Sequence, residues 1–331
     1  MSPKAIVGVD IGGTKILAGV LKSGGTVTRR VRLNTPERSK HPSVVEDTIV
    51  AAVSELVGAG DIDAVGVGAA GFVNVAGSTV RFSPHLSWRD EPLKGALAQR
   101  LGVPVIIDND ANTAAWAELK FGAGRGYRQM LCITLGTGIG GALVIDGQLF
   151  RGSNGMAGEF GHMQVVPDGL RCECGNRGCW EQYASGSALI REARELVARR
   201  SPAAHQLREM VEDDASRLSG PVLAKAAKAG DLASVEIFRG IGDWLGTGLA
   251  SLAAAFDPEV IVIGGGVSDA DQVLLDPARE ALSRKLTGRG FRNEPPVLKA
   301  ELGIDAGFIG AADLARRSLE NGRVRRSGSL G

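Results

Sequence analysis

The chain contains two β-hairpin patterns of the same kind, and this repetition constrains its fold more than any other feature. The first joins two apolar runs, residues 6–9 and 16–21, through the turn Asp-Ile-Gly-Gly-Thr-Lys. The second joins residues 131–135 and 142–145 through Gly-Thr-Gly-Ile-Gly-Gly, and an Asp-Gly turn then leads into residues 148–150. Alternation of short apolar runs with glycine turns predicts hairpins. We therefore predict two sheets, each with a glycine-rich first turn.

Helical patterns follow the first hairpin in alternation with strands, which indicates an α/β protein. Residues 43–46, Ser-Val-Val-Glu, have the form of a capping box, and apolar residues recur at helical spacing until Gly58. Apolar runs at 62–67, 103–107 and 260–263 predict buried strands. Residues 187–200 and 221–255 predict helices, with a break in the second near Gly230, whereas the polar segment 201–219 gives no prediction.

Length and charge exclude several classes of protein. A chain of 331 residues predicts about two domains. The formal net charge of +1 argues against a nucleic-acid partner, and Arg323, Arg325 and Arg326 are interpreted as a solvated tail. No run approaches the roughly 20 apolar residues of a membrane span, and the first apolar run is broken by Asp10, unlike a signal peptide. We expect a cytoplasmic protein without a membrane partner.

One histidine and three cysteines have the spacing of metal ligands. Nine residues separate His162 from Cys172, which is followed by Cys174 and Cys179. Residues i and i+2 of an extended backbone point to the same side, and two nearby glycines let the chain return with its last thiolate. An imidazole and three thiolates form a closed tetrahedral shell that suits structural Zn²⁺. A disulfide is the weaker alternative, and the fourth cysteine, Cys132, is interpreted as a buried apolar residue.

The glycine turns are candidate phosphate sites, because they expose backbone N–H groups where no side chain blocks approach. For either turn alone a plain hairpin is the simpler interpretation, but two turns plus a third glycine run favour a nucleotide. Residues 136–141 also fit G-x-G-x-x-G, yet a strand rather than a helix is predicted after them, so a dinucleotide fold is rejected. The candidate nucleotide-binding residues are Asp10, Gly12, Gly13, Thr14, Lys15, Gly136, Thr137, Gly138, Gly264, Gly265 and Gly266.

Four blocks in this order resemble the ROK family of bacterial sugar kinases and sugar-responsive repressors: residues 10–15, 109–112, 135–141 and 159–181. The resemblance runs from about residue 5 to about residue 315. It implies an actin/hexokinase-like (ribonuclease H-like) fold of two domains with a cleft between them. We expect a small N-terminal domain of residues 1–112 plus 305–331, closed by the C-terminal helix, and a large domain of 113–304 carrying the metal ligands. Family members are commonly dimers or tetramers, so the resemblance also implies a homo-oligomer.

Asp110 lies between a predicted strand and a predicted helix, and the sequence allows two interpretations of it. Locally, the simpler one is that Asp108, Asn109 or Asp110 caps the helix. The resemblance instead assigns Asp110 the role of general base. It also implies a sugar site formed by Gly71, Asn109, Asp110, Glu159, His162 and Glu181, with His162 serving both zinc and sugar, and Mg²⁺ bound with ATP near Asp10.

Within the family, residues 68–74 and 83–88 are similar to actinobacterial ATP-dependent glucokinases. Polyphosphate-using relatives tend to have Ser-Gly where this chain has Thr14-Lys15. The resemblance therefore implies ATP-dependent phosphorylation of a hexose, with D-glucose favoured. Kinases of N-acetylglucosamine, N-acetylmannosamine and fructose share the same motifs and stay open as alternatives. ROK repressors carry a DNA-binding module before the first glycine turn, where nine residues precede Asp10, so we expect an enzyme.

Overall fold

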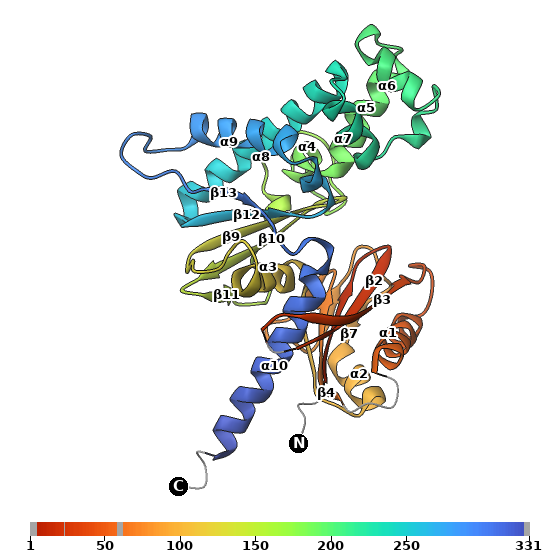
Figure 1. Ribbon diagram of the computed structural model, residues 1–331, viewed down its shortest axis with the longest axis vertical. Coiled ribbons are helices and arrows are strands. Elements are labelled where there is room, and N and C mark those ends of the chain that lie inside the picture. Colours follow the sequence, from red (N-terminus) through yellow and green to blue (C-terminus); the bar gives the residue numbers. More distant parts are fainter. Residues whose placement is uncertain (1–4, 23, 58–61, 328–331) are drawn as a thin grey trace. The chain divides into compact units, whose positions relative to one another are not determined.

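The computed structural model describes residues 5–22, 24–57 and 62–327, with side chains described as far as residue 321. It is an α/β protein that divides into two compact units (Figure 1). Unit 1 comprises Met1–Gly126, Ala142–Gly158 and Glu301–Gly331, and unit 2 comprises Tyr127–Gly141 and Glu159–Ala300. Gly58 and the arginine side chains of the expected C-terminal tail lie outside what is described. No helix of the described residues is long and apolar enough to cross a membrane.

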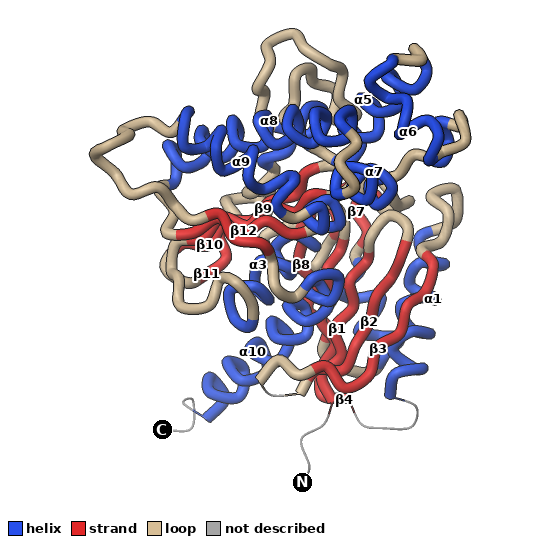
Figure 2. Tube along the Cα trace, turned by 45° about the horizontal axis from the view of Figure 1, so that its top comes forward, coloured by secondary structure: helices blue, strands red, loops and turns tan. Residues whose placement is uncertain are grey.

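Unit 1 is built on a five-stranded sheet of order β3-β2-β1-β4-β8. The strands are β1 Ala5–Ile11, β2 Lys15–Leu21, β3 Val27–Asn34, β4 Ile62–Ala69 and β8 Val105–Asn109. β1 and β2 pair antiparallel up to Ile11 and Ile16, which confirms the predicted first hairpin, and β4 pairs in parallel with β1 and β8. Figure 2 shows β1, β2 and β3 side by side. The strand predicted at 103–107 is shifted by two residues, because Pro104 precedes it and Asp108 and Asn109 continue the pairing with β4.

Helices cover both faces of this sheet, and the alternation of β1 decides which side chains meet them. Val7, Val9 and Ile11 belong to a buried cluster with α1 (Pro42–Val57) and α2 (Leu93–Leu101). Ile6 faces a second cluster that includes α10 (Ala306–Ser327), against which α3 (Asp110–Phe121) also packs. On this second face Gly8 permits close contact, since a Cβ there would lie 1.8 Å from the carbonyl oxygen of Phe308. Asp10 shares that face.

The expected capping box at the start of α1 is wrong. The helix begins at Pro42, so Ser43 lies inside it rather than before it. The ring Nδ1 of His41 faces the N–H of Ser43 at 3.3 Å and occupies the position of a cap. Glu46 points elsewhere, because its Oε2 accepts a hydrogen bond from Arg100 at 3.3 Å. A proline at the first helical position explains the earlier start, since it has no N–H to satisfy.

The remaining strands form two further sheets. A three-stranded antiparallel sheet, β5 Phe72–Val73, β6 Val80–Phe82 and β7 Arg89–Glu91, extends unit 1. The other five-stranded sheet has the order β11-β10-β9-β12-β13 and confirms the second predicted hairpin. Its strands are β9 Met130–Leu135, β10 Ile139–Ile145, β11 Gln148–Phe150, β12 Val260–Gly264 and β13 Val297–Lys299.

The remaining helices belong to unit 2. They are α4 Glu181–Ala184, α5 Gly186–Ala198, α6 His205–Met210, α7 Gly220–Lys228, α8 Leu232–Phe256 and α9 Gln272–Lys285. The predicted break near Gly230 is confirmed, because α7 ends and α8 begins on either side of it. Short 3-10 turns lie at Phe160–His162, Pro202–Ala204, Ala215–Arg217 and Gly266–Ala270, with a fifth at Gly303–Asp305 in unit 1. The segment 201–219, which the sequence left open, thus consists of α6 between two such turns.

The structural division differs from the expected domain boundaries at 112/113 and 304/305. All of α3 stays in unit 1, because it packs along α10. Residues 142–158 also stay there: Arg151 binds Asp108, and Gly155 approaches the backbone so closely that a Cβ would lie 2.6 Å from the amide nitrogen of Val75. Both contacts join residues that are far apart in sequence, so local patterns could not indicate them.

Candidate active site

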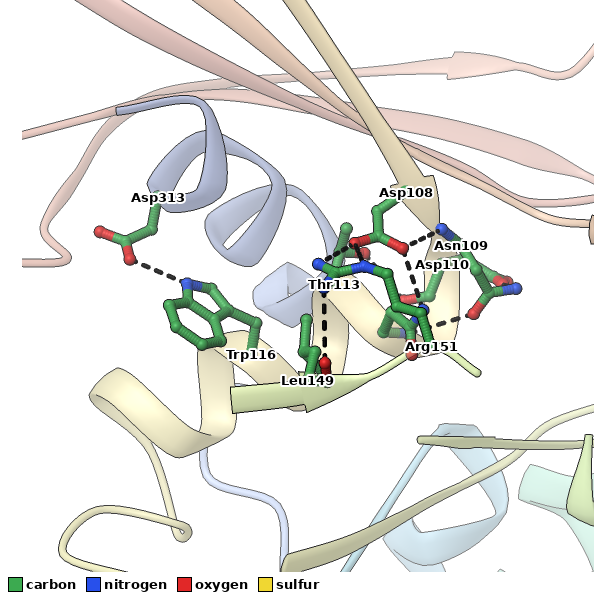
Figure 3. A network of polar contacts seen from close by, with 9 residues as sticks. Asp108, Asn109, Asp110, Thr113, Trp116, Leu149, Arg151 and Asp313 are labelled. Atoms are coloured by element: carbon green, nitrogen blue, oxygen red, sulfur yellow. Dashed lines mark hydrogen bonds and ion pairs between the residues drawn. The ribbon is translucent and has the colours of Figure 1, made fainter. Parts of the chain in front are cut away.

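The junction between β8 and α3 resolves the competing interpretations of its three polar residues (Figure 3). Asn109 is the cap of α3, because its side-chain oxygen accepts a hydrogen bond from the N–H of Asn112 at 3.1 Å. Asp110 is the first residue of the helix. The capping role, which the sequence could not assign to one of the three, therefore falls to Asn109 and leaves the Asp110 carboxylate available.

Asp108 is held by a basic partner that the sequence did not reveal. Nε and Nη2 of Arg151 donate to its Oδ2 at 2.9 and 2.6 Å (Figure 3). The N–H of Asn109 and the amide of Asn112 donate to its other oxygen, each at 2.9 Å. This carboxylate is buried with its hydrogen-bonding capacity occupied, so Asp108 has a structural role at the site.

Burial determines the protonation of Asp110. Burial is the largest influence and raises its pKa to about 6, while the N–H groups of Ala111 and of Asp110 itself and the amide of Asn109 lower it. That amide donates to Oδ1 at 3.0 Å. The helix N-terminus therefore favours the carboxylate as expected, but burial outweighs it. At neutral pH most molecules still carry the ionised form, which can accept a proton.

Asp10, near the end of β1, is another carboxyl of unit 1 whose pKa is raised. Its pKa is about 7, because burial chiefly, and then the charge of Asp110, raise it more than Lys15 lowers it. Its surroundings include the first turn of α10, where a Cβ on Gly307 would lie 2.4 Å from the Asp10 Cγ. A carboxyl whose pKa is raised by the charge of a neighbouring carboxylate is suited to a cation, and carboxylate oxygens are the ligands that Mg²⁺ prefers.

The remaining predicted site residues of unit 1 are those of the first glycine turn and Gly71. The turn is closed by a hydrogen bond from the N–H of Gly12 to the carbonyl of Lys15 at 3.0 Å. Gly71 has a φ of +142°, and a Cβ there would lie 2.5 Å from the carbonyl of Phe82, so only glycine fits. Its carbonyl accepts from the amide of Asn109 at 3.1 Å. Gly71, Asn109 and Asp110 are thereby brought together.

Unit 2 contains the predicted metal ligands as one cluster. One ligand atom each from His162, Cys172, Cys174 and Cys179 lies within 4.8 Å of all the others. Nδ1 of His162 is 3.6 Å from the Sγ of Cys172, and the sulfurs of Cys174 and Cys179 are also 3.6 Å apart. Three sulfurs and an imidazole nitrogen at such spacing fit Zn²⁺. In the absence of metal, burial chiefly, and then the carboxylate of Glu181, raise the pKa of the Cys172 thiol, so zinc binding would release its proton.

The predicted sugar-binding residues of unit 2 surround the same imidazole. Oε1 of Glu181 lies 3.6 Å from Nδ1 of His162, and Oε2 of Glu159 lies 3.9 Å from Nε2. Glu181 also reaches the second glycine turn, since its Oε2 accepts from the N–H of Ile139 at 3.4 Å. The sequence did not indicate the role of Trp180, which is fully buried and donates its indole N–H to the carbonyl of Trp244 in α8. That contact fixes the loop between the last ligand and Glu181.

A pocket of about 610 Å³ in unit 2 is lined by some of the predicted nucleotide-binding residues. Gly136, Thr137 and Gly266 line it, which brings the second glycine turn next to the glycines after β12. Arg191 and Arg194 of α5 line it as well, and the sequence gave no indication of them. Their positive charge suits an anionic ligand. Gly138 instead faces Glu181, where a Cβ would lie 2.5 Å from Oε2.

Known proteins resemble this chain along most of its length. The model of the ROK family matches residues 6–318. The glucokinase of Streptomyces coelicolor is 46% identical over 310 residues, which cover 94% of this chain and 97% of that protein. A ROK family glucokinase from Streptomyces griseus, solved in complex with glucose and AMPPNP, has a TM-score of 0.87 and 47% identity, covering 95% of this chain and 99% of that one. The xylose repressor of Bacillus subtilis is 28% identical, over 93% of this chain and 76% of the repressor.

Proposed function

This chain belongs to the ROK family and has its actin/hexokinase-like fold, and on that premise we propose that it is a glucokinase. It transfers the terminal phosphoryl group of ATP to D-glucose and releases glucose 6-phosphate and ADP. Similarity to two Streptomyces glucokinases, one of them bound to glucose and an ATP analogue, supports this activity. The lower identity to a sugar-responsive repressor makes the regulatory alternative the weaker one.

Asp110 acts as the general base that takes the proton of the sugar 6-hydroxyl. The observation that carries this assignment is the division of roles at the start of α3: Asn109 caps the helix and Asp108 binds Arg151. Asp110 has a pKa of about 6, which is close to neutral pH. A base with such a pKa is ionised at neutral pH and still accepts a proton as the hydroxyl attacks.

The sugar hydroxyls are bound by the Asn109 amide, the backbone near Gly71 and the side chains of Glu159, His162 and Glu181. Nδ1 of His162 faces both the sulfur of Cys172 and the carboxylate of Glu181, whereas Nε2 faces Glu159. We assign Nδ1 to the metal and Nε2 to the sugar. Carboxylates and amides are suited to a ring of hydroxyls because each accepts or donates in a fixed plane.

The turns 12–14 and 136–138 and the glycines 264–266 hold the phosphates of ATP, together with Lys15. The N–H groups of Gly12 and Gly136 close their own turns, so neighbouring N–H groups are the donors to the phosphates. Asp10 would hold Mg²⁺, because the neighbouring charge of Asp110 makes that position favourable for a cation. When bound, Mg²⁺ neutralises charge on the phosphates that are being transferred. Asp110 accepts the proton, the sugar-binding side chains aim the hydroxyl, and exclusion of water from the site limits hydrolysis of ATP.

Zn²⁺ would have a structural role, because the three cysteines and His162 would leave no open position for a reacting water. These four residues would hold the ion and thereby fix the segment that carries Glu159 and Glu181, which buried Trp180 anchors to α8. We further propose that the enzyme acts in the cytoplasm, where it supplies glycolysis with phosphorylated sugar, and that it assembles as a homo-oligomer, a dimer or a tetramer.

A coupled assay for ADP with a panel of hexoses tests the proposed function. Glucose should give the highest kcat/KM, above N-acetylglucosamine, N-acetylmannosamine, mannose and fructose. A parallel series with polyphosphate in place of ATP, followed through the sugar phosphate formed because this donor releases no ADP, should give little product. Preference for an N-acetylhexosamine, or for polyphosphate over ATP, would assign the chain to another branch of the family. No phosphorylation of any hexose would contradict the enzyme assignment.

A further inference from the structure

A buried carboxylate outside the catalytic set binds three backbone N–H groups. Glu118, in the last turns of α3, is 1% exposed. Its Oε2 accepts from the N–H of Ala123 at 2.9 Å and of Glu301 at 3.1 Å, and its Oε1 accepts from the N–H of Leu302 at 2.8 Å. Within the described residues it forms no ion pair. The side chain therefore connects the end of α3 with a segment 183 residues further along the chain.

The location of this carboxylate is unfavourable on local grounds. The C-terminal end of a helix carries partial negative charge, which repels a carboxylate, and a buried charge without a cation is costly. Gly122 leaves room for it, since a Cβ there would lie 2.0 Å from Oε2. Three charge-assisted hydrogen bonds offset these costs. A buried glutamate is therefore stable at this position only because its carboxylate accepts these three hydrogen bonds.

The three N–H groups lie where the chain first leaves unit 1 and where it enters unit 1 for the last time. The chain leaves after Gly126, returns for Ala142–Gly158, and enters finally at Glu301. Ala123 lies shortly before the first exit, whereas Glu301 and Leu302 begin the last segment. After Leu302 the chain makes the 3-10 turn Gly303–Asp305 and enters α10 at Ala306. One carboxylate thereby fixes both chain segments to the end of α3.

The first turn of α10 forms part of the surroundings of Asp10. A Cβ on Gly307 would lie 2.4 Å from the Asp10 Cγ and 2.6 and 2.7 Å from its two oxygens. The space between this turn and the carboxyl is thus too small for a methyl group, and a shift of the turn toward Asp10 would displace the carboxyl. Four residues lie between Leu302, which Glu118 holds, and Gly307, which closely approaches Asp10.

We propose that Glu118 is a positioning residue for phosphoryl transfer: it fixes the start of α10 and, through Gly307, the orientation of the Asp10 carboxyl. The proposal depends on the proposed function, in which Asp10 acts at the phosphates. Glucose binding should depend little on Glu118, because the Gly71 and Asn109 contacts are formed independently of α10.

The variant Glu118→Gln tests this, because its amide nitrogen must face a backbone N–H donor and at least one of the three hydrogen bonds is lost. We expect kcat to fall about tenfold or more, the loss typical of a misplaced reacting group, with KM for glucose within about twofold of wild type. Amide hydrogen exchange across residues 301–310 should accelerate. Arg125→Ala is the matched control: it removes an exposed ion pair to the Glu301 side chain, 3.2 Å long, and leaves the Glu118 bonds in place. Its kcat should equal that of wild type.

A second control separates positioning from stability. Leu56→Ala empties a buried position under α1, on the opposite face of the sheet, and should lower Tm while leaving kcat unchanged well below the transition. If Glu118→Gln does not fold, Gly307→Ala probes the same contact, and it should lower kcat and not glucose affinity. Wild-type kcat in folded Glu118→Gln, or an equal loss of kcat in Leu56→Ala, would overturn the proposal. Failure of the proposed function would be visible separately, as absence of glucose phosphorylation by wild-type protein.

Discussion

The pKa of Asp110 predicts how activity varies with acidity. If only the carboxylate accepts the sugar proton, a pKa of about 6 makes about nine-tenths of the molecules active at pH 7 and about one-tenth at pH 5. The kcat/KM for glucose should therefore fall about tenfold across this interval, with a limiting slope of one. The coupled assay at saturating ATP and Mg²⁺ measures it, with a control that the coupling enzymes are not limiting. A kcat/KM that stays constant between pH 7 and pH 5 would refute the reasoning.

The same raised pKa has a consequence for stability, which can be measured without substrate. Asp110 has a higher pKa in the folded protein, about 6, than the ordinary value of 3.8 for aspartate, so the folded state binds the proton more tightly. Its contribution destabilises the protein progressively as pH rises from about 4 to about 6, and is constant above that. A shift of about two units corresponds to about 3 kcal/mol. Asp110→Asn should consequently raise the urea midpoint at pH 7 and have little effect at pH 4; no gain at pH 7 would contradict the burial argument.

Three further substitutions have expected outcomes. Cys179→Ser should lose the zinc found by elemental analysis and weaken glucose binding, and active protein containing no zinc would contradict the scaffold role. Arg151→Met leaves the buried Asp108 carboxylate without its cation. Since the Arg151 side chain is one-third exposed, we expect about 2–3 kcal/mol of destabilisation in urea unfolding, less than for a fully buried pair. An unchanged urea midpoint would show that the ion pair contributes nothing to stability. Phe308→Ala, at a fully buried position of α10, should cost about 3–5 kcal/mol, and a loss below about 1 kcal/mol would mean that α10 packs differently from the structure.

Patterns of short range were sufficient to predict much of the fold. The two glycine hairpins, the buried strands and the broken pair of helices after residue 220 depend on local alternation and turn chemistry, which the sequence displays directly. The clustering of the candidate metal ligands was predictable for a related reason, because Cys172, Cys174 and Cys179 lie close together along the chain and only His162 is further away. The start of α1 was not predicted correctly, since Ser43 and Pro42 offered competing start signals.

Contacts between distant segments could not be predicted. Arg151 and Asp108 are 43 residues apart, and nothing around either residue indicates the pairing. Glu118 has the spacing of an ordinary residue of an amphipathic helix, and its role depends on a chain segment that returns 183 residues later. The division of roles among Asp108, Asn109 and Asp110 was equally hidden, because all three are good helix caps and only the true end of β8 decides among them.

Asp110→Asn, measured for glucose binding and for turnover in the same preparation, tests the central claim most directly. Asparagine preserves the shape of the side chain but cannot accept the proton. We expect the calorimetric Kd for glucose to stay within a few-fold of wild type while kcat falls to below about a hundredth, the contribution typical of a general base. Retention of more than about a hundredth of the wild-type kcat, with glucose binding intact, would show that another group takes the proton.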